Sequence, residues 1–263
     1  MIKEDVKFQN SVVFEGMTSI RSIIKGVELG VNNRKIEKIL FDTDKYQKNI
    51  KNIGYLRAVS KTMGFEVLET DSEKIKDITL GTSHGGIVAI AKERTIPCLS
   101  KNTEIIDSGF YCMLEGIEDP YNFGYTLRSL YACGCNGIIL PERNWMTAAG
   151  VVARSSAGAS ELLPMFTSIP EIAADIFHQH GYRVICADER TDNILGECEL
   201  NLPLLLIVGG EKRGISKNLL EKTDMLIKIR YAREFNASLS AASATTMFAY
   251  EIMRQESKKT ALE

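Results

Sequence analysis

The stretch Leu204-Leu-Leu-Ile-Val-Gly-Gly-Glu-Lys-Arg-Gly-Ile-Ser216 decides the fold of the chain. Its first five residues are apolar and end at two glycines, a pattern that predicts a buried strand running into a tight turn. Gly209 and Gly210 have no Cβ, so a ligand can lie directly against their backbone, while Glu211 and Gly214 keep the loop polar and bendable. In α/β proteins, ligands usually bind in loops at the carboxyl ends of parallel strands. An ordinary strand-to-helix turn is the competing interpretation, because short glycine motifs often occur by chance.

The order of the elements around this stretch predicts two domains of α/β class. The chain has 263 residues, enough for two domains. Residues 1–95 are predicted to form a small α/β domain and 96–107 a linker. From residue 108 to 263 larger strands and helices alternate, which predicts a mainly parallel sheet covered on both faces.

The expected elements follow from apolar periodicity and from turn residues. In the first domain we expect helices at 17–29, 50–63 and 72–78, the second ended by Gly64, and strands at 38–42, 65–68 and 86–91. In the second we expect strands at 111–114, 137–140, 163–166, 183–187, 204–208 and 225–229, and helices at 125–133, 145–153, 169–180, 218–222 and 239–257.

The composition excludes several classes of protein. The chain is 44% hydrophobic and 25% charged, the balance of a globular protein in water. No apolar run is long enough to span a membrane and the N-terminus has no apolar signal core, so we expect a cytoplasmic protein. Cys133 and Cys135 form the one close cysteine pair, and a packing role is favoured over a metal or redox role. His178 and His180 lie on different sides of a helix, and we expect no metal.

Charge is distributed unevenly along the chain. The net charge is −2, but residues 1–100 hold 16 basic and 13 acidic residues, a net of +3. Eight basic residues between positions 34 and 61 face only three acidic ones. A basic patch suits the phosphate backbone of a nucleic acid, and a solvated helix face is the alternative. The candidate RNA contacts are Arg34, Lys35, Lys38, Arg57 and Lys61.

A second polar stretch follows the strand that ends at Leu114. Asp119 and Pro120 predict a turn, and Asn122 can cap the helix that follows. Arg128 is then expected about one turn inside that helix, near its electropositive start, where an anion is favoured. A salt bridge on the helix surface is the other interpretation of Arg128.

A third stretch runs from Ile227 through a polar loop into a helix. Small residues at positions 241, 242, 244 and 249 predict that this helix packs very closely on its neighbour.

These three stretches resemble the three motifs of the SpoU/TrmH group in the SPOUT superfamily of RNA methyltransferases. The first motif has the form Asn-x-Gly-x-x-x-Arg after an Asp-Pro turn, the second Gly-x-Glu-x-x-Gly, and the third begins Ser-Leu-Asn. The matching residues here are Asn122, Gly124 and Arg128, then Gly209, Glu211 and Gly214, then Ser238 and Leu239. The segment 154–159 is also similar to a Ser-Ala-Gly-Ala segment of the family.

The resemblance covers about residues 108–257 and implies a deep trefoil knot, S-adenosyl-L-methionine as cofactor, and a homodimer. Residues 11–92 resemble the small L30e-like domain that precedes the catalytic domain in ribose methyltransferases of 23S rRNA, with Gly16 and His84-Gly85-Gly86 at similar places. The reaction implied is methyl transfer to a ribose 2′-hydroxyl of RNA, with rRNA favoured over tRNA. No membrane partner is implied.

The resemblance also assigns roles to residues. The backbone at Gly209, Ile229 and Leu239 would hold the adenine and ribose of the cofactor, with Gly210 and Gly214 in the same loop. Asn122 would orient the target ribose, Glu211 would pair with a basic group or order its loop, and Ser238 would complete the catalytic set.

The family proposal makes Arg128 a base. Lowering an arginine pKa from above 12 to near 7 costs roughly 7 kcal/mol at about 1.36 kcal/mol per unit. We therefore favour Arg128 as the group that binds the target phosphate and stabilises the developing alkoxide.

One departure from the family lies in the third motif, where Ser240 replaces the usual asparagine. Serine is shorter and cannot span the same gap. This departure supports an alternative function, a knotted RNA-binding protein that no longer methylates. An unrelated phosphate-binding enzyme is disfavoured, because the sequence has neither a P-loop nor a Gly-x-Gly-x-x-Gly turn.

Overall fold

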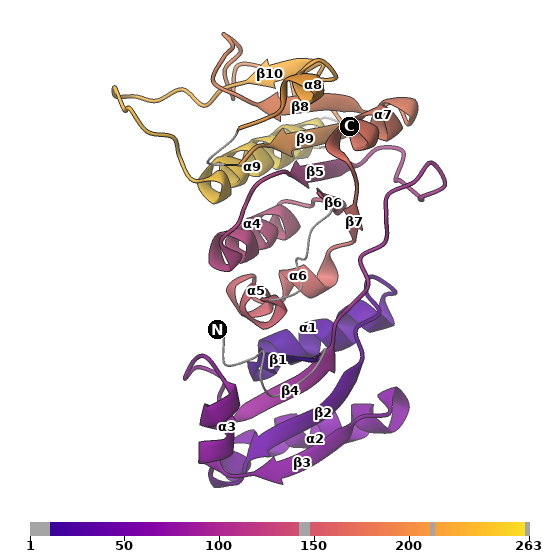
Figure 1. Ribbon diagram of the computed structural model, residues 1–263, viewed down its shortest axis with the longest axis vertical. Coiled ribbons are helices and arrows are strands. Elements are labelled where there is room, and N and C mark those ends of the chain that lie inside the picture. Colours follow the sequence, from indigo (N-terminus) through magenta and orange to yellow (C-terminus); the bar gives the residue numbers. More distant parts are fainter. Residues whose placement is uncertain (1–10, 142–147, 211–213, 261–263) are drawn as a thin grey trace. The chain divides into compact units, whose positions relative to one another are not determined.

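The computed structural model describes residues 11–141, 148–210 and 214–260, and the chain divides into two compact units (Figure 1). Unit 1 contains residues 1–95 and 144–162, and unit 2 contains 96–143 and 163–263. The division at Thr95 coincides with the expected end of the first domain. Two parts differ from the sequence analysis: the expected linker belongs to unit 2, and residues 144–162 belong to unit 1 although they lie far along the chain.

Unit 1 is built on a four-stranded mixed sheet with the order β1-β4-β2-β3. Strands β1 and β2 both pair antiparallel with β4, and β3 pairs parallel with β2. The strands are β1 (Ser11–Glu15), β2 (Ile36–Asp42), β3 (Glu66–Thr70) and β4 (Ile87–Lys92). The helices are α1 (Gly16–Glu28), the short 3-10 helix η1 (Thr43–Lys45), α2 (Tyr46–Met63), α3 (Ser72–Ile78), α5 (Ala149–Ser155) and α6 (Ala159–Leu162).

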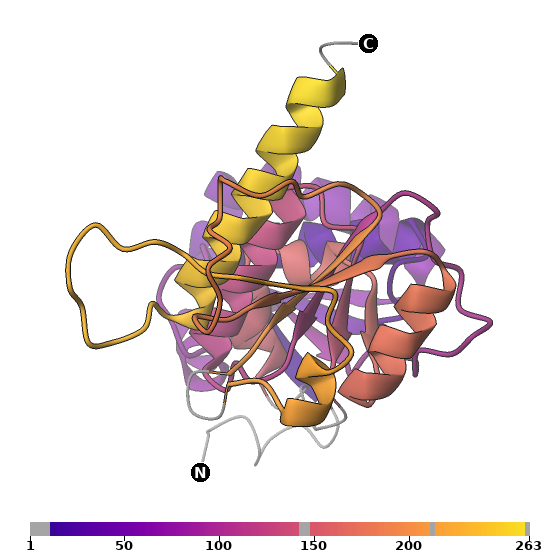
Figure 2. The same cartoon turned by 90° about the horizontal axis from the view of Figure 1, so that it is seen from above.

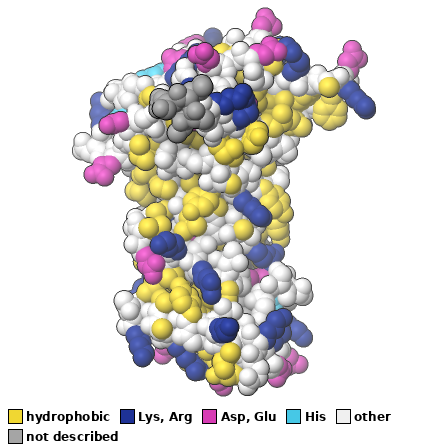
Figure 3. Space-filling model, turned by 180° about the vertical axis from the view of Figure 1, so that it is seen from behind, with side chains coloured by type: hydrophobic (Ala, Val, Ile, Leu, Met, Phe, Trp, Pro, Cys, Tyr) yellow, Lys and Arg dark blue, Asp and Glu magenta, His cyan; other side chains and the backbone are white. Residues whose placement is uncertain are grey.

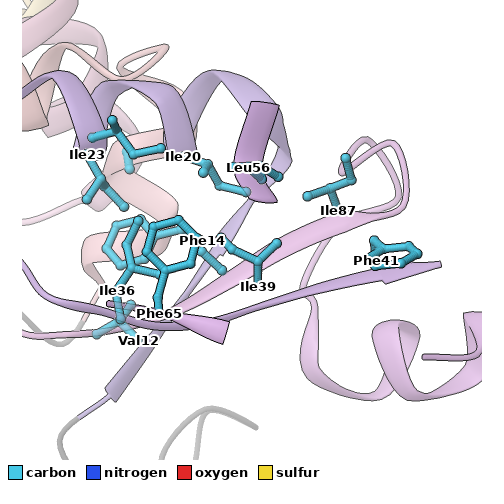
Figure 4. Packing of buried hydrophobic residues seen from close by; sticks show 14 of the residues in the cluster. Val12, Phe14, Ile20, Ile23, Ile36, Ile39, Phe41, Leu56, Phe65 and Ile87 are labelled. Atoms are coloured by element: carbon cyan, nitrogen blue, oxygen red, sulfur yellow. The ribbon is translucent and has the colours of Figure 1, made fainter. Parts of the chain in front are cut away.

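Helix α1 supplies one wall of the core of unit 1. Its apolar residues recur three and four apart, so Ile20 and Ile23 lie on one face and are fully buried. Figure 4 shows these side chains beside Phe14 and Ile39 of the sheet. Burying each such side chain contributes about 1.5–3 kcal/mol, so this face fixes the helix on the sheet.

Helices α5 and α6 are integral to unit 1. Ala149 and Ala153 of α5 lie in the same buried cluster as the residues of β1 and α1. At α6, the carboxylate of Glu161 accepts hydrogen bonds from Nε of Arg34 at 2.8 Å and from Nη2 at 3.2 Å. The side chains are 1% and 3% exposed, so this is a buried, bidentate ion pair. Nδ2 of Asn32 adds a bond to the Glu161 carbonyl at 2.8 Å.

Unit 2 is a six-stranded sheet with the order β10-β8-β9-β5-β6-β7, and every strand pair in it is parallel. Its strands are β5 (Phe110–Leu114), β6 (Gly137–Leu140), β7 (Met165–Thr167), β8 (Arg183–Ala187), β9 (Leu204–Val208) and β10 (Met225–Ile227). Its helices are α4 (Pro120–Ala132), α7 (Pro170–Gln179), α8 (Lys217–Leu220) and α9 (Ala241–Thr260). The predicted parallel sheet is confirmed, with β6, β8 and β9 at the predicted residues.

Helices cover both faces of this sheet. Phe177 of α7 and Leu219 of α8 lie in one hydrophobic cluster with Met113 and Ile207 of the strands. Helices α4 and α9 lie together on the other side of the sheet (Figure 2). Within the described residues, no helix is both long and apolar enough to cross a bilayer.

The buried ion pair of unit 1 leads to a stability prediction. Glu161→Ala leaves the Arg34 guanidinium buried without its counter-charge, and breaking such a pair costs about 3–5 kcal/mol. Lys74→Ala is the matched control, since it removes an exposed pair with Asp71 and is expected to cost at most about 1 kcal/mol. The free energy of unfolding, measured in urea by circular dichroism, checks both values. Equal small losses in the two variants would show that the buried pair does not hold α6 in unit 1.

Candidate functional site

The three stretches singled out in the sequence follow β5, β9 and β10, so they emerge at the same edge of the parallel sheet. Strands β5 and β9 are neighbours, and Leu114 pairs with Val208 at their ends. Strand β10 lies on the far side of β8 from β9. The loops after β5 and β9 therefore begin side by side, and the loop after β10 begins two strands away.

The loops after β5 and β9 touch through bare backbone. A Cβ placed on Gly116 would lie 2.3 Å from the Cα of Gly210, and a Cβ on Gly210 would lie 2.7 Å from the Cα of Gly116. Real Cβ atoms essentially never approach other atoms this closely. The absence of a side chain at Gly210 thus serves the packing of two loops, in addition to any ligand.

Gly209 and Gly214 shape the loop itself. A Cβ on Gly209 would meet the carbonyl carbon of Gly214 at 2.9 Å and Ile215 at 2.7 Å. Gly214 adopts φ +61°, a left-handed conformation that favours glycine, and its N–H donates to the carbonyl of Gly210 at 3.0 Å. Glu211 lies outside the described residues. A side chain at Gly209 would therefore distort the loop whether or not a ligand is bound.

Helix α4 starts earlier than expected, and Asp119 rather than Asn122 is its cap. The Asp119 carboxylate accepts the N–H of Asn122 at 2.8 Å, and Pro120 occupies the first helical turn. The prediction that Asn122 caps the helix is wrong, because an Asp-Pro pair is itself a start signal in which proline needs no N–H. Asn122 is half-buried in the first turn of α4.

Arg128 is exposed on α4, more than two turns from the start of the helix. The expectation that it lies near the electropositive start is wrong, because the field of the helix terminus fades within the first turn. Among the described residues, no carboxylate pairs with Arg128. Its guanidinium is thus presented to solvent, as a group that binds an external anion must be.

The loop after β10 carries Ile229, Ser238 and Leu239. It stands away from the sheet in two views, and Ser238 is exposed while the other two are half-buried (Figure 1, Figure 2). The N–H of Leu239, an expected cofactor donor, donates to the hydroxyl of Tyr231 at 3.1 Å. The Tyr231 ring contacts Phe235 across the loop. A ligand that uses the Leu239 N–H therefore has to replace the tyrosine hydroxyl.

Ser240, the residue that departs from the family motif, caps helix α9. Its Oγ accepts the N–H of Ser243 at 3.1 Å, the bond that an N-cap residue makes. Ala241 and Ala249 of α9 are buried, and Thr246 donates to Ser129 of α4 at 2.8 Å. The expected close packing of this helix on a neighbour is confirmed, and serine performs the capping that asparagine also can.

Glu115 is a polar residue of the site that the sequence analysis did not single out. It directly follows β5, and its Oε2 atom is buried without a hydrogen-bond partner among the described residues. Burial raises the pKa of the carboxyl, and the nearby Glu171 raises it further. A carboxyl that protonates readily can accept or donate a hydrogen bond to a ligand. An acidic residue at the carboxyl end of a fully apolar strand is the signal that could have identified it.

Of the five basic residues predicted to contact RNA, one is buried and the other four are exposed or half-buried. Arg34 is 2% exposed, its guanidinium is bonded to Glu161, and it lies over the Phe14 ring at 4.6 Å. Its prediction as an RNA contact is wrong, because a charge run in sequence does not reveal a buried partner 127 residues away. Lys35, Arg57 and Lys61 are exposed and Lys38 is half-buried.

No cluster of three or more His, Cys, Asp or Glu residues in the described part of the chain could hold a metal ion. All six cysteines are free. Cys135 of the close pair is buried, and burial raises the pKa of its thiol to about 12, which makes it unreactive.

Comparison with known sequences matches this site to one family. The profile of the SpoU rRNA Methylase family matches residues 109–250. A putative TrmH family tRNA/rRNA methyltransferase of Staphylococcus haemolyticus is 32% identical over 54% of this chain, and the match spans 57% of that relative's length. The 23S rRNA (guanosine-2′-O-)-methyltransferase RlmB of Shewanella oneidensis is 29% identical over 74% of this chain and 81% of its own.

Solved structures share the fold. The AdoMet-bound rRNA methyltransferase of Sinorhizobium meliloti superposes with a TM-score of 0.76 at 22% identity, over 93% of this chain and 87% of that one. The SpoU methyltransferase AviRb of Streptomyces viridochromogenes, in complex with AdoMet, gives 0.74 at 20% identity, over 94% and 91%. The chain thus shares the fold of these solved structures.

The glycine contact between the two loops can be tested by adding one methyl group. Gly116→Ala forces the loops apart and is expected to lower the free energy of unfolding by about 1–3 kcal/mol, the usual effect of overpacking. Gly54→Ala in α2 is the control, because a Cβ there meets nothing within 4 Å, and it is expected to raise that free energy by up to about 1 kcal/mol. Urea unfolding of both variants measures these changes. An unchanged free energy of unfolding in Gly116→Ala would contradict the contact between the two loops.

Proposed function

We propose, since this chain belongs to the SpoU rRNA methylase family, that it transfers a methyl group from S-adenosyl-L-methionine to a ribose 2′-hydroxyl of RNA. The observation that carries the proposal is the convergence of the three family motifs at the carboxyl edge of one parallel sheet. Ribosomal RNA is the substrate class we favour, because the Shewanella relative is named for 2′-O-methylation of 23S rRNA. We place the protein in the cytoplasm, where such RNA is found.

The residues of the site fit the proposed cofactor. S-Adenosyl-L-methionine supplies an electrophilic methyl group bound to a positively charged sulfur. Gly209, Gly210 and Gly214 offer backbone without side chains, and the N–H of Leu239 is a donor that a tyrosine hydroxyl occupies here. The half-buried Ile229 lies in the same loop as Leu239. A knotted path of the chain through these loops is part of the proposal.

The target side of the site rests on helix α4. A 2′-hydroxyl is a weak nucleophile whose oxygen gains negative charge as its proton passes to water. Arg128 is positively charged, exposed and without a carboxylate partner among the described residues, so it can bind a target phosphate and stabilise that oxygen. Half-buried Asn122, at the start of the same helix, orients the ribose, and Ser238 and Glu211 complete the proposed set.

RNA also contacts unit 1 in this proposal, as an L30e-like substrate-binding domain. Lys35, Lys38, Arg57 and Lys61 provide the positive charge that attracts a phosphate backbone. The alternative of a non-methylating RNA-binding protein drew on Ser240. Because Ser240 caps α9, its presence is compatible with an intact third motif.

A second copy of the chain is the partner that we propose for helices α4 and α9. Tyr121 and Tyr125 lie one turn apart on α4 and are 42% and 51% exposed, and Met247 and Tyr250 are similarly exposed on α9. Patches of exposed hydrophobic side chains are also visible in the space-filling view (Figure 3). Exposed apolar surface of this kind marks interaction sites, and the two helices already pack on each other.

The dimer is tested by sedimentation velocity. We expect the wild-type protein to sediment as a dimer and the double variant Tyr125→Glu, Tyr250→Glu as a monomer, because two desolvated carboxylates cannot be accommodated in an apolar interface. Tyr55→Glu, at an exposed tyrosine of α2 in unit 1, is the control and is expected to remain dimeric. A monomeric wild-type protein, or a double variant that stays dimeric, would refute this interface.

Arg128 provides the test of the chemistry. Arg128→Ala is expected to fold and to bind S-adenosyl-L-methionine with unchanged affinity by calorimetry. We expect it to lose methyl transfer by a factor of at least about 100, the scale for losing one preorganised donor. Single-turnover transfer of labelled methyl to rRNA transcripts, followed by mapping of the methylated nucleotide, measures the loss.

Arg128→Lys separates the two roles of this residue. If Arg128 stabilises charge, lysine restores part of the rate at neutral pH, because it keeps a point charge but loses the planar grip on phosphate. A lysine rate that instead rises more steeply with pH than the wild-type rate would indicate a base. A wild-type rate in Arg128→Ala would remove this residue from the mechanism.

A further inference from the structure

Unit 1 contains a cavity of about 340 Å³ that none of the proposed roles uses. It forms where the β1–α1 junction, helix α2, the loop at residues 83–87 and the end of α5 meet. Its lining includes the side chains of Glu15, Thr18, His84 and Arg154. Its volume lies within the range of about 300–1,000 Å³ typical of small-molecule sites.

The start of α1 opens into this cavity, and no side chain of the described residues caps its backbone N–H groups. Glu15 is the N-cap residue but makes no side-chain bond to the helix, and the first turn holds no acidic residue. The first N–H groups of a helix lack partners within it, and they carry about half a positive charge. Gly16, with φ +80°, leaves this turn of α1 without a Cβ at its first residue. Such a helix start attracts an anion.

His84 is a second donor, and it is buried in the wall of the cavity. The residue is 6% exposed, and its Nδ1 accepts the N–H of Gly86 at 3.1 Å. Burial, and then the nearby Lys45, lowers the pKa of this histidine, while the more weakly acting Glu15 and Asp42 raise it. The imidazole is therefore neutral at pH 7, and with Nδ1 accepting, Nε2 carries the proton. Nε2 has no partner among the described residues.

Arg154 brings a positive charge next to the Glu15 carboxylate, which already accepts three hydrogen bonds. Its Nη1 donates to Oε2 of Glu15 at 2.7 Å. The other oxygen of Glu15 accepts the N–H of Leu80 at 2.7 Å and of Gly81 at 3.3 Å. A carboxylate with its lone pairs so occupied and its charge matched by arginine does not exclude an anion from the cavity.

We propose that this cavity binds one nucleotide of the RNA substrate, with its phosphate at the start of α1 and at Nε2 of His84, and its nucleoside in the remaining volume. The cavity exceeds the size of a bare phosphate ion, which is why a whole nucleotide is inferred. The inference rests on the proposed function, in which RNA is the substrate. Because Arg154 comes from helix α5, this helix contributes directly to RNA binding.

The ligand class is tested with the full-length, ¹⁵N-labelled protein titrated with adenosine 5′-monophosphate, adenosine or inorganic phosphate. Adenosine 5′-monophosphate is expected to shift the amides of Met17 and Thr18 and the ring nitrogens of His84 at lower concentration than the other two ligands. Equal shifts from inorganic phosphate at the same concentration would mean that the cavity binds free phosphate, and would overturn the proposal that it binds a nucleotide. No shift at these residues with any ligand would overturn the site.

The role in RNA binding is tested with Thr18→Glu against Thr18→Gln. Thr18 is exposed in the first turn of α1, where a carboxylate stabilises the helix but repels a phosphate. We expect Thr18→Glu to bind a single-stranded 12-nucleotide RNA about tenfold more weakly than Thr18→Gln, the loss of one charge-assisted bond, with no lower melting temperature. This opposite effect on stability and binding excludes simple unfolding as the cause.

Two further variants complete the test. Leu29→Glu and Leu29→Gln place the same pair of side chains at the far end of α1, roughly 16 Å away, and should bind the RNA alike. His84→Asn keeps an acceptor for the Gly86 N–H but removes the donor at Nε2, and should weaken RNA binding as Thr18→Glu does. Equal RNA affinity of Thr18→Glu and Thr18→Gln would refute the inference.

Failure of the inference is distinguishable from failure of the proposed function. If Thr18→Glu and Thr18→Gln bind RNA equally well and the wild-type protein methylates rRNA, only the proposed role of the cavity is overturned. A wild-type protein that methylates no rRNA overturns the proposed function, and the nucleotide titration still decides whether the cavity binds a phosphate-bearing ligand.

Discussion

Two loops of unit 2 meet at Gly116 and Gly210 with no side chain between them, and the geometry of the candidate site depends on this contact. The ends of β5 and β9 are level, and the N–H of Glu115 extends their ladder by donating to the Val208 carbonyl at 3.0 Å. Any larger residue at either glycine would separate the loops. Glu115 directly precedes Gly116 in this loop, and burial, followed by the nearby Glu171, raises the pKa of its carboxyl.

The central strands β5, β6 and β9 of unit 2 were predictable because they are buried along their whole length. A run such as Leu204–Val208 has no polar residue to alternate with, so its length alone marks the strand. Helix α4 shows where such reasoning fails. Asp119-Pro120 suggests a turn and a helix start equally well, and the helix expected after a turn begins five residues later than α4 does. Arg128 lies in the third turn of α4, whereas the expected helix placed it in the first turn. The anion site predicted at Arg128 therefore relied on a helix terminus that is not near this residue.

Long-range partners could not be predicted from one sequence. Arg34 stands in a run of basic residues, and nothing near it in the chain indicates that Glu161 neutralises it inside the protein. The segment 149–162 packs in unit 1 because Ala149 and Ala153 meet the apolar cluster of β1 and α1, while Asn32 and Arg34 bind Glu161. Ser240 is different, because here the local sequence departs from the family motif but the structure keeps a helix cap at this position. Its hydroxyl accepts the N–H of Ser243 at the start of α9.

The participation of residues 149–162 in unit 1 has a consequence for how the chain folds as it is synthesised. The bond between Asn32 and Glu161 spans 129 residues, so unit 1 cannot close until β5, α4 and β6 have left the ribosome. Closing so long a loop costs conformational entropy before its contacts form, which slows folding. Residues 11–95 therefore wait with the surface of α1 that α5 and α6 contact still uncovered, a state in which exposed apolar surface favours aggregation. Chaperones that bind such surfaces during translation would act on this protein within that interval.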